Sequence, residues 1–435
     1  MSHAIDDPVW AGLERRLAEV EAWIREPVPW RPAGEEPPSG SIRLVRGPAF
    51  GRSGSGSRRT GLRPVALLVA LALAALVGLL VVGVASHPAP RTTLVPGFNT
   101  LGVITHSRIR GIAVALPDGR ALVIGVDPES SGSASDLAEV YDPATATFTP
   151  TGPLPPSFRP TPSDGTVFTA TGLGDGRVLV TNGHNAAAAI FDPMTATFTL
   201  TGSLSTPRSY PSTAVLGSGQ VLVVGGEADT GPAAPIFSSA EVFDPTTGRF
   251  TPTGSLAVAL SAATATTLAD GRVLVTAGEG QAGLAELYDP HTRAFAPTGT
   301  MTTLRRQHAV SMLSDGRVLV LGGLLTPSPG PDDELLGSAE VFDPATGSFT
   351  AVGSLVVPRR MANATLLNDG RVLVTGGYDL AGIDTQLPSE LFDPSTMRFS
   401  PVAGSLIAPE SAVARLADGN VLFVGGNGAV DLFHP

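Results

Sequence analysis

Arginine side chains recur along most of the chain at places that share a common spacing. A guanidinium is a planar fork of hydrogen-bond donors that pairs with carboxylate, phosphate or sulfate groups, so several on one face would bind an anionic ligand. Tyr210 and His308 lie beside two of these sites. In a competing interpretation, each arginine donates to carbonyl oxygens of its own loop and is structural. The candidate ligand-binding residues are Arg108, Arg159, Arg208, Arg305, Arg306, Arg359 and Arg360, with Tyr210 and His308.

Residues for several other kinds of chemistry are missing. The chain has no cysteine, which excludes thiolate catalysis, disulfides, cysteine-ligated zinc and iron–sulfur clusters. The Gly-x-Ser-x-Gly, His-Glu-x-x-His and phosphate-loop patterns are also absent. Its 28 basic residues against 39 acidic ones give a net charge of −11, which does not favour nucleic acid as a partner. We expect no cofactor, no metal and no catalytic residue, and favour a binding function over an enzyme.

The arginines sit within a repeat of about 50 residues. Each copy has a turn of Asp-Gly-Arg type, a short apolar strand, a pair of glycines in most copies, a variable loop, and an Asp-Pro turn between two aromatic residues. Asp-Gly supplies the positive φ of a tight hairpin, and Asp-Pro presets a second turn. Two hairpins make four antiparallel strands per copy. The first turns begin at Asp118, Asp175, Ser218, Asp270, Asp315, Asp369 and Asp418.

The last copy ends one strand short, and the first residues of the repeat region supply the missing strand. Residues 98–118 align without a gap on residues 198–218, which places Phe98 in the second aromatic column. Sharing one unit between both ends of the region closes a ring. The sequence therefore predicts an all-β domain at 92–435, a seven-bladed β-propeller of four-stranded antiparallel blades closed by the strand near Phe98. An acidic column, such as Glu241 and Glu340, repeats in six of the seven units and predicts scaffold hydrogen bonds.

The pattern resembles the kelch repeat, as found in the central domain of galactose oxidase and in a bacterial membrane-anchored type. The tight turns are nearly the same in every copy whereas the loops differ in length and content, which predicts that binding takes place on the loop face. The resemblance implies that arginines there bind acidic peptides. This sequence differs from the kelch pattern because it has Phe where kelch repeats usually carry Trp. Galactose oxidase uses a copper site with a Tyr–Cys crosslink, and the absence of cysteine excludes that chemistry here.

The first 85 residues differ in composition from the repeats. Residues 1–26 form a predicted amphipathic helix, in which Trp10, Leu17 and Ile24 share one face. Residues 27–64 are a linker rich in Pro, Gly, Ser and Arg, and residues 65–85 contain no polar side chain over a length that spans a bilayer as a helix. The arginine-rich flank predicts a cytoplasmic N-terminus, with the propeller outside the cell membrane.

These features predict a single-pass, membrane-anchored module that binds a protein, an acidic peptide or a glycan outside the cytoplasm. One alternative is a transmembrane signalling receptor that works through the cytoplasmic helix, whose residues 8–26 are candidates for self-association. Another is an exported carbohydrate-active enzyme that needs neither cysteine nor metal. The sequence leaves ligand identity, oligomeric state and the choice between Sec and twin-arginine export open.

Overall fold

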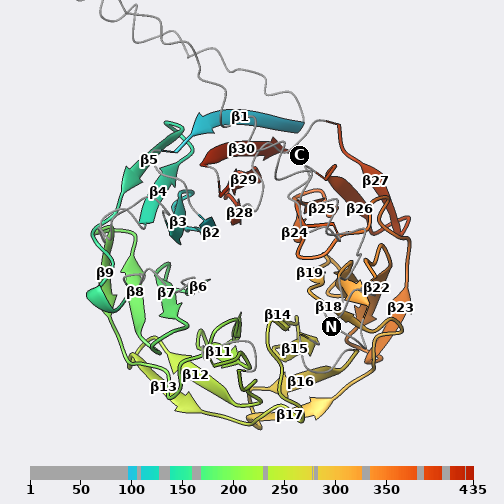
Figure 1. The fold of residues 1–435 in the computed structure, drawn as a ribbon, viewed down its shortest axis with the longest axis horizontal. Coiled ribbons are helices and arrows are strands. Elements are labelled where there is room, and N and C mark those ends of the chain that lie inside the picture. The colour runs from blue at the N-terminus through green and yellow to red at the C-terminus, as the bar shows by residue number, and fades with distance from the viewer. Residues whose placement is uncertain are drawn as a thin grey trace, which may run out of the picture. The chain divides into compact units, whose positions relative to one another are not determined.

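The computed structural model describes residues 97–104, 109–126, 138–158, 168–228, 234–276, 278, 283–325, 334–379, 387–403, 412–426 and 428–435. Within them, seven four-stranded antiparallel sheets surround a central axis as blades (Figure 1). The predicted all-β, seven-bladed propeller is confirmed. The helix predicted at 1–26, the linker at 27–64 and the membrane span at 65–85 lie outside the described residues, as do Arg108 and Arg159.

Each of blades 1 to 6 uses its four strands in chain order, with the first strand nearest the centre of the ring (Figure 1). Blade 1 comprises β2 (Ile109–Ala115), β3 (Ala121–Val126), β4 (Ala138–Asp142) and β5 (Thr147–Pro150); blade 2 β6 (Phe168–Gly172), β7 (Val178–Asn182), β8 (Ala188–Asp192) and β9 (Thr197–Leu200); and blade 3 β10 (Ser212–Val215), β11 (Val221–Val224), β12 (Ala240–Asp244) and β13 (Arg249–Pro252).

The second half of the ring repeats this order, with one additional two-stranded sheet in the described residues, β18 (Arg305–Arg306) with β21 (Leu324–Leu325). Blade 4 comprises β14 (Thr264–Thr267), β15 (Val273–Thr276), β16 (Ala285–Asp289) and β17 (Ala294–Pro297); blade 5 β19 (Ala309–Met312), β20 (Val318–Leu321), β22 (Ala339–Asp343) and β23 (Ser348–Ala351); blade 6 β24 (Asn363–Leu366), β25 (Val372–Thr375), β26 (Glu390–Asp393) and β27 (Arg398–Pro401); and blade 7 β28 (Ala412–Arg415), β29 (Val421–Val424), β30 (Ala429–His434) and β1 (Gly97–Val103).

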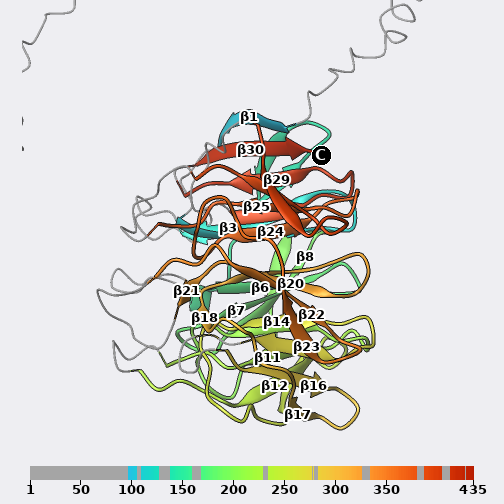
Figure 2. The same ribbon diagram turned by 90° about the vertical axis from the view of Figure 1, so that its right-hand side faces the viewer.

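Both kinds of tight turn form as the sequence predicts. In blade 1, the Asp118 carboxylate accepts the Arg120 backbone N–H at 3.0 Å, and Gly119 takes a φ of 92°. The Asp142 carboxylate accepts the Ala144 N–H at 2.8 Å in the Asp-Pro turn. Since these turns join strands one to two and three to four, they share one face of the ring, the tight-turn face. The other connections share the opposite loop face (Figure 2).

The ring is closed by pairing the first described strand with the last. β1 is antiparallel to β30 with Phe98 opposite Phe433, and their ring centroids are 5.0 Å apart. The Thr100 hydroxyl donates to the Asp431 carboxylate at 2.7 Å. The strand that contains Phe98 thus supplies the fourth strand of blade 7.

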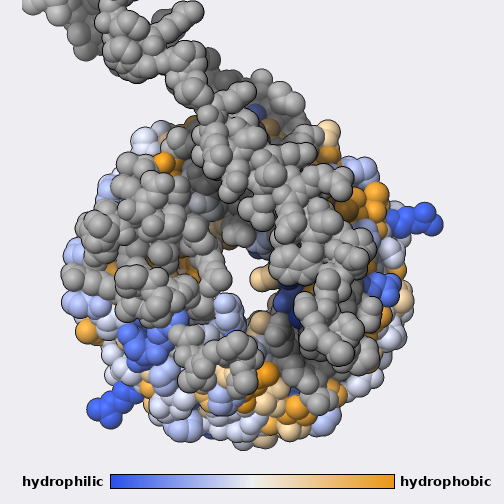
Figure 3. All heavy atoms as spheres, in the orientation of Figure 1, coloured by the Kyte–Doolittle hydropathy of each residue, from blue (hydrophilic) through white to orange (hydrophobic). Residues whose placement is uncertain are grey.

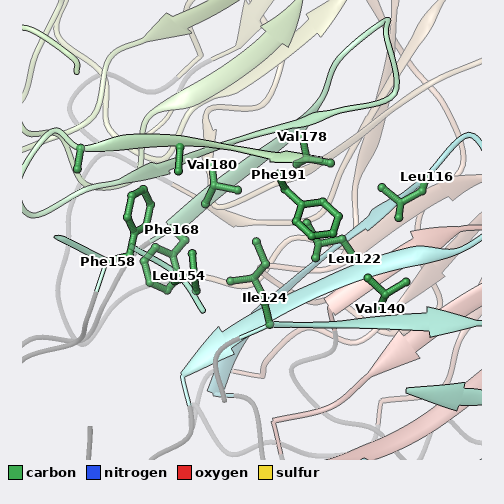
Figure 4. Close-up of a cluster of buried hydrophobic side chains, with 13 residues drawn as sticks. Leu116, Leu122, Ile124, Val140, Leu154, Phe158, Phe168, Val178, Val180 and Phe191 are labelled. Atoms are coloured by element: carbon green, nitrogen blue, oxygen red, sulfur yellow. The ribbon is translucent and has the colours of Figure 1, made fainter. Parts of the chain in front are cut away.

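The core lies between adjacent blades. The second strand of most blades is buried along its whole length, as with Val178–Asn182, because each of its faces meets a neighbouring blade. Between blades 1 and 2, Leu122, Ile124 and Val140 pack against Val178 and Phe191 (Figure 4). The aromatic pair across the Asp-Pro turn recurs from blade to blade, with ring centroids 4.9 Å apart in blade 2 and 4.8 Å in blade 3.

Candidate functional site

The segments that cross from one blade to the next hold three of the predicted arginines in the interior. Arg208 precedes blade 3 and is 1% exposed. Its Nη2 lies 3.2 Å from Glu241 Oε1, and its Nη1 donates to the carbonyl oxygens of Gly225 and Ser239 at 2.9 Å. Burial lowers the pKa of Arg208, and the Glu241 carboxylate opposes that shift. Arg208 therefore binds groups of the blade that it precedes.

The same geometry recurs before blades 5 and 6. Arg305 Nη2 lies 3.0 Å from Glu340 Oε1, and Arg359 Nη2 lies 2.9 Å from Glu390 Oε1. Both guanidinium groups are fully buried. Because Arg208, Arg305 and Arg359 face glutamates and carbonyl oxygens rather than solvent, we do not assign them to a ligand surface.

The glutamates also bind the backbone of the crossings. Glu390 accepts the N–H groups of Val356 and Val357 at 2.7 and 3.1 Å, and Glu340 accepts those of Thr302 and Thr303 at 2.7 and 3.0 Å. A carboxylate that receives two backbone donors and a guanidinium is well compensated for its burial. The scaffold bonds predicted for the acidic column are present.

Blade 4 keeps the glutamate but has no arginine in its crossing. Glu286 is buried and accepts the Ala257 N–H with both carboxylate oxygens, at 3.1 and 3.2 Å. Leu260, which is 2% exposed, occupies the sequence position that Arg208, Arg305 and Arg359 hold elsewhere. The backbone cap therefore forms without the ion pair.

A second arginine follows the buried one before blades 5 and 6. Arg306 and Arg360 are half-buried, and Arg306 belongs to the small sheet with Leu324. Arg360 Nη1 donates to Gln307 Oε1 at 2.9 Å, and its guanidinium carbon lies 5.5 Å from the centre of the Tyr378 ring. No carboxylate in the described part of the chain forms an ion pair with Arg360. Its charge is held in place by an amide and an aromatic ring.

The residue two positions after the buried arginine, or after its counterpart Leu260, adopts an unusual backbone conformation in four consecutive crossings. Tyr210, Ala262, Gln307 and Met361 have φ between 50° and 55°. Such left-handed conformations cost roughly 1–3 kcal/mol for residues other than glycine and are frequent at functional sites. Adjacent crossings are joined by backbone bonds from Met361 N to Gln307 O at 2.8 Å and from Ala262 N to Tyr210 O at 3.1 Å.

These contacts define a mouth cluster of Gln307, Arg360, Met361 and Tyr378. Gln307 precedes the inner strand β19, Arg360 and Met361 precede the inner strand β24, and Tyr378 follows β25, all on the loop face. Figure 3 shows strongly hydrophilic residues beside the central opening of the ring. Met361 is 53% exposed. Tyr210 is 40% exposed, but it belongs to another crossing and contacts Ala262 through its backbone.

Sequence reasoning missed Gln307, Met361 and Tyr378. Aligning the crossings would have placed Gln307 and Met361 with Tyr210, since each stands two residues after the buried arginine.

His308 is buried beside the cluster and faces the neighbouring blade. Its Nε2 lies 2.8 Å from the Thr276 hydroxyl of blade 4. Burial, and secondarily the charge of Arg305, lowers the pKa of His308 to about 3. This histidine is therefore neutral at physiological pH and joins two blades.

The described residues offer no centre for a metal ion, because no group of three or more His, Asp or Glu side chains converges among them. With no cysteine in the chain, these residues do not fit a copper centre that depends on a Tyr–Cys crosslink.

Comparison with known proteins identifies the fold. No protein-family model matches the chain, and no curated protein sequence matches it. Among solved structures, it is similar to a fungal alcohol oxidase of the AA5 family, determined in complex with copper. The TM-score is 0.59 at 19% sequence identity, and the match covers 78% of this chain and 75% of the oxidase. The likeness shows a shared propeller fold of the galactose oxidase type.

Proposed function

We propose that this protein is a membrane-anchored binding module whose loop face captures an acidic peptide segment outside the cytoplasm. The observation that carries the proposal is Arg360. Its neighbour Arg359 forms a buried ion pair with Glu390. Arg360, in contrast, is half-buried at the ring opening and forms no ion pair with a carboxylate of the described residues. A second arginine that the scaffold does not use for an ion pair is suited to a ligand.

The surroundings of Arg360 suit a carboxylate carried on a peptide. Gln307 and Tyr378 hold the guanidinium in place, so less side-chain entropy is lost when an anion binds. Met361 presents an exposed apolar side chain next to it, which suits the aliphatic stem of a glutamate or a neighbouring apolar residue. The combination of cation and apolar surface favours an acidic peptide over a glycan.

The membrane anchor rests on the sequence of residues 65–85 and its arginine-rich flank. No helix in the described ranges is long and apolar enough to cross a membrane. Fusing a reporter protease site at either side of residues 65–85 and treating intact cells tests the orientation.

A kelch-type repeat is the finer family that we propose for the blades. The glycine pairs support it, because Gly322 and Gly323 take φ values of 65° and 96° where the chain passes closely over Arg359 and Arg306. The signalling and enzyme alternatives stay predictions. The helix on which signalling depends lies outside the described residues.

A binding measurement tests the acidic-peptide site. The full chain in detergent micelles is titrated into a fluorescein-labelled poly-glutamate peptide, with anisotropy as the readout. Arg360→Ala should weaken binding by roughly 10- to 150-fold, because a charge-assisted hydrogen bond contributes roughly 1.5–3 kcal/mol. The control is Arg293→Ala, which removes an exposed arginine from the tight-turn face. Equal affinities for the wild type and Arg360→Ala would reject the site, and binding of sulfated oligosaccharides in place of the peptide would reject the peptide assignment.

A further inference from the structure

The outermost strands of the blades differ in how their free edges are protected. An edge strand exposes N–H and C=O groups that can pair with another chain, and proline removes one of these donors. β9 ends in Leu200 and β23 in Ala351. The equivalent residue of the other four outer strands in blades 1 to 6 is proline, namely Pro150, Pro252, Pro297 and Pro401.

Among the outer strands of blades 1 to 6, β9 and β23 lack this proline, and the edge of β9 is the more apolar of these two. Four sister strands pair normally with proline at the equivalent position, so the ladder does not need the Leu200 N–H, which faces outward. The strand Thr197–Leu200 has no charged residue, and it pairs with β8 alone in the described part of the chain. Leu200 is 55% exposed, and Met194, in the turn just before β9, is 87% exposed. Two large apolar side chains thus flank an unprotected edge.

We infer that β9 is the contact between two copies of this chain, paired antiparallel about a two-fold axis so that two blades form one continuous sheet. A closed two-fold contact uses the same patch on both copies. The strand β9 carries no charged residue, so it adds no local like-charge repulsion to a contact between two copies whose net charge is −11 each.

The position of β1 supports a second copy as the occupant. Blade 7, which holds β1, lies two blades from blade 2 around the ring (Figure 1). A two-fold axis perpendicular to the sheet of blade 2 runs along the ring's tangent there, and that direction points from blade 2 toward the side of the ring where β1 lies. Both copies would therefore carry β1 at the same end of the axis.

That arrangement fits two chains held in one membrane. Residues 86–96 separate the proposed span from β1, so the chain between them is at most about 40 Å long. Both copies would then approach the membrane from the same side. The β9 contact relies on the proposed membrane anchor only for the shared direction of approach to the membrane. If the β9 contact were disproved, the proposed Arg360 site would not be affected, since that site lies on other blades.

Cysteine crosslinking decides the contact, because the native chain has no cysteine. Thr199→Cys places a thiol at the exposed middle of β9, and Thr350→Cys places one at the matching position of β23. With the full chain in native membranes and a mild oxidant, we expect a disulfide-linked dimer for Thr199→Cys. We expect none for Thr350→Cys. Equal crosslinking of the two variants, or none in either, would overturn the inference.

A second pair of variants separates this contact from pairing by the predicted N-terminal helix. Leu200→Pro introduces the residue that four sister strands carry, so the blade should still fold, and Ala351→Pro makes the same change in β23. In the Thr199→Cys background, Leu200→Pro should abolish the crosslinked dimer and Ala351→Pro should preserve it. A crosslinked dimer that survives Leu200→Pro with unchanged circular dichroism would contradict pairing through β9.

Discussion

The crossings before blades 4 and 6 are both fixed to the blade that follows, but by different sets of residues. Both are held by a buried glutamate from the third strand of the blade that follows, Glu286 in one and Glu390 in the other. The crossing before blade 6 adds Arg359, whose guanidinium pairs with that glutamate, whereas the crossing before blade 4 has Leu260. The carboxylate cap is thus the common element, and the arginine is an addition to it.

This difference separates structural arginines from the candidate binding arginine. A buried arginine that faces a glutamate and several carbonyl oxygens serves the blade, whatever its position in the repeat. Arg360 has no such partner among the described residues. The crossing before blade 6 therefore combines a structural arginine and an available one in adjacent positions.

The largest expected effect on stability comes from replacing the glutamates of the two crossings. Glu390→Gln should lower the free energy of unfolding by about 3–5 kcal/mol, because it leaves the Arg359 charge buried without its partner. Glu286→Gln should cost only about 1 kcal/mol, since its amide oxygen still accepts the Ala257 N–H and no cation loses a partner. Urea unfolding at pH 7 measures both. Similar losses would show that the arginine is not what distinguishes the two crossings.

A second prediction concerns His308, whose place in the crossing before blade 6 is taken by Ala362. Because the folded pKa of about 3 is below the unfolded value, the unfolded chain binds more protons at acidic pH and stability falls as the pH drops from 6.5 toward 3. The expected slope is about 1.4 kcal/mol per pH unit from this group. Denaturant midpoints measured across this range should flatten in His308→Gln, and an unchanged slope would contradict the assignment.

The smallest expected effect on stability comes from replacing the residues with positive φ in the two crossings. Met361→Gly and Ala262→Gly should each raise stability by about 0.5–1 kcal/mol, because glycine adopts positive φ without the penalty of a side chain. Affinity for the poly-glutamate peptide should fall only in Met361→Gly, which removes an exposed side chain of the mouth cluster. A loss of affinity in both variants would place the ligand on the backbone of the crossings instead.

The sequence was sufficient for the architecture because each blade is specified locally. Asp-Gly and Asp-Pro turns fix two hairpins, and the aromatic on each side of the second turn fixes their register, as with Phe191 opposite Phe198. The missing strand at the end of the last unit then required closure through Phe98. The turn and aromatic signals lie within a few residues of the contacts that they predict, whereas the closure follows from counting strands at the two ends of the repeat region.

The orientation of the arginines was not predictable in the same way. Whether Arg305 points inward depends on Glu340, 35 residues later, and on the carbonyl oxygens of Gly322 and Ser338. The repeat shows that an arginine stands in a crossing but not which neighbour it meets. Joint occurrence was an available signal, because Arg208, Arg305 and Arg359 each precede a blade that has a glutamate at the same position of the repeat. No such signal existed for the positive φ of the residue two positions later, which is Tyr210, Gln307 or Met361.

The closure of the ring also has a consequence for how the protein is made. β30 lies between β1 and β29, and the Thr100–Asp431 bond spans 331 residues of chain. During synthesis, β1 emerges before the other described strands, and its partner strand β30 (Ala429–His434) emerges after them. The outer strand of blade 7 thus stays available to chaperones or proteases until translation reaches β30. Closure of the ring therefore requires the synthesis of both β1 and β30.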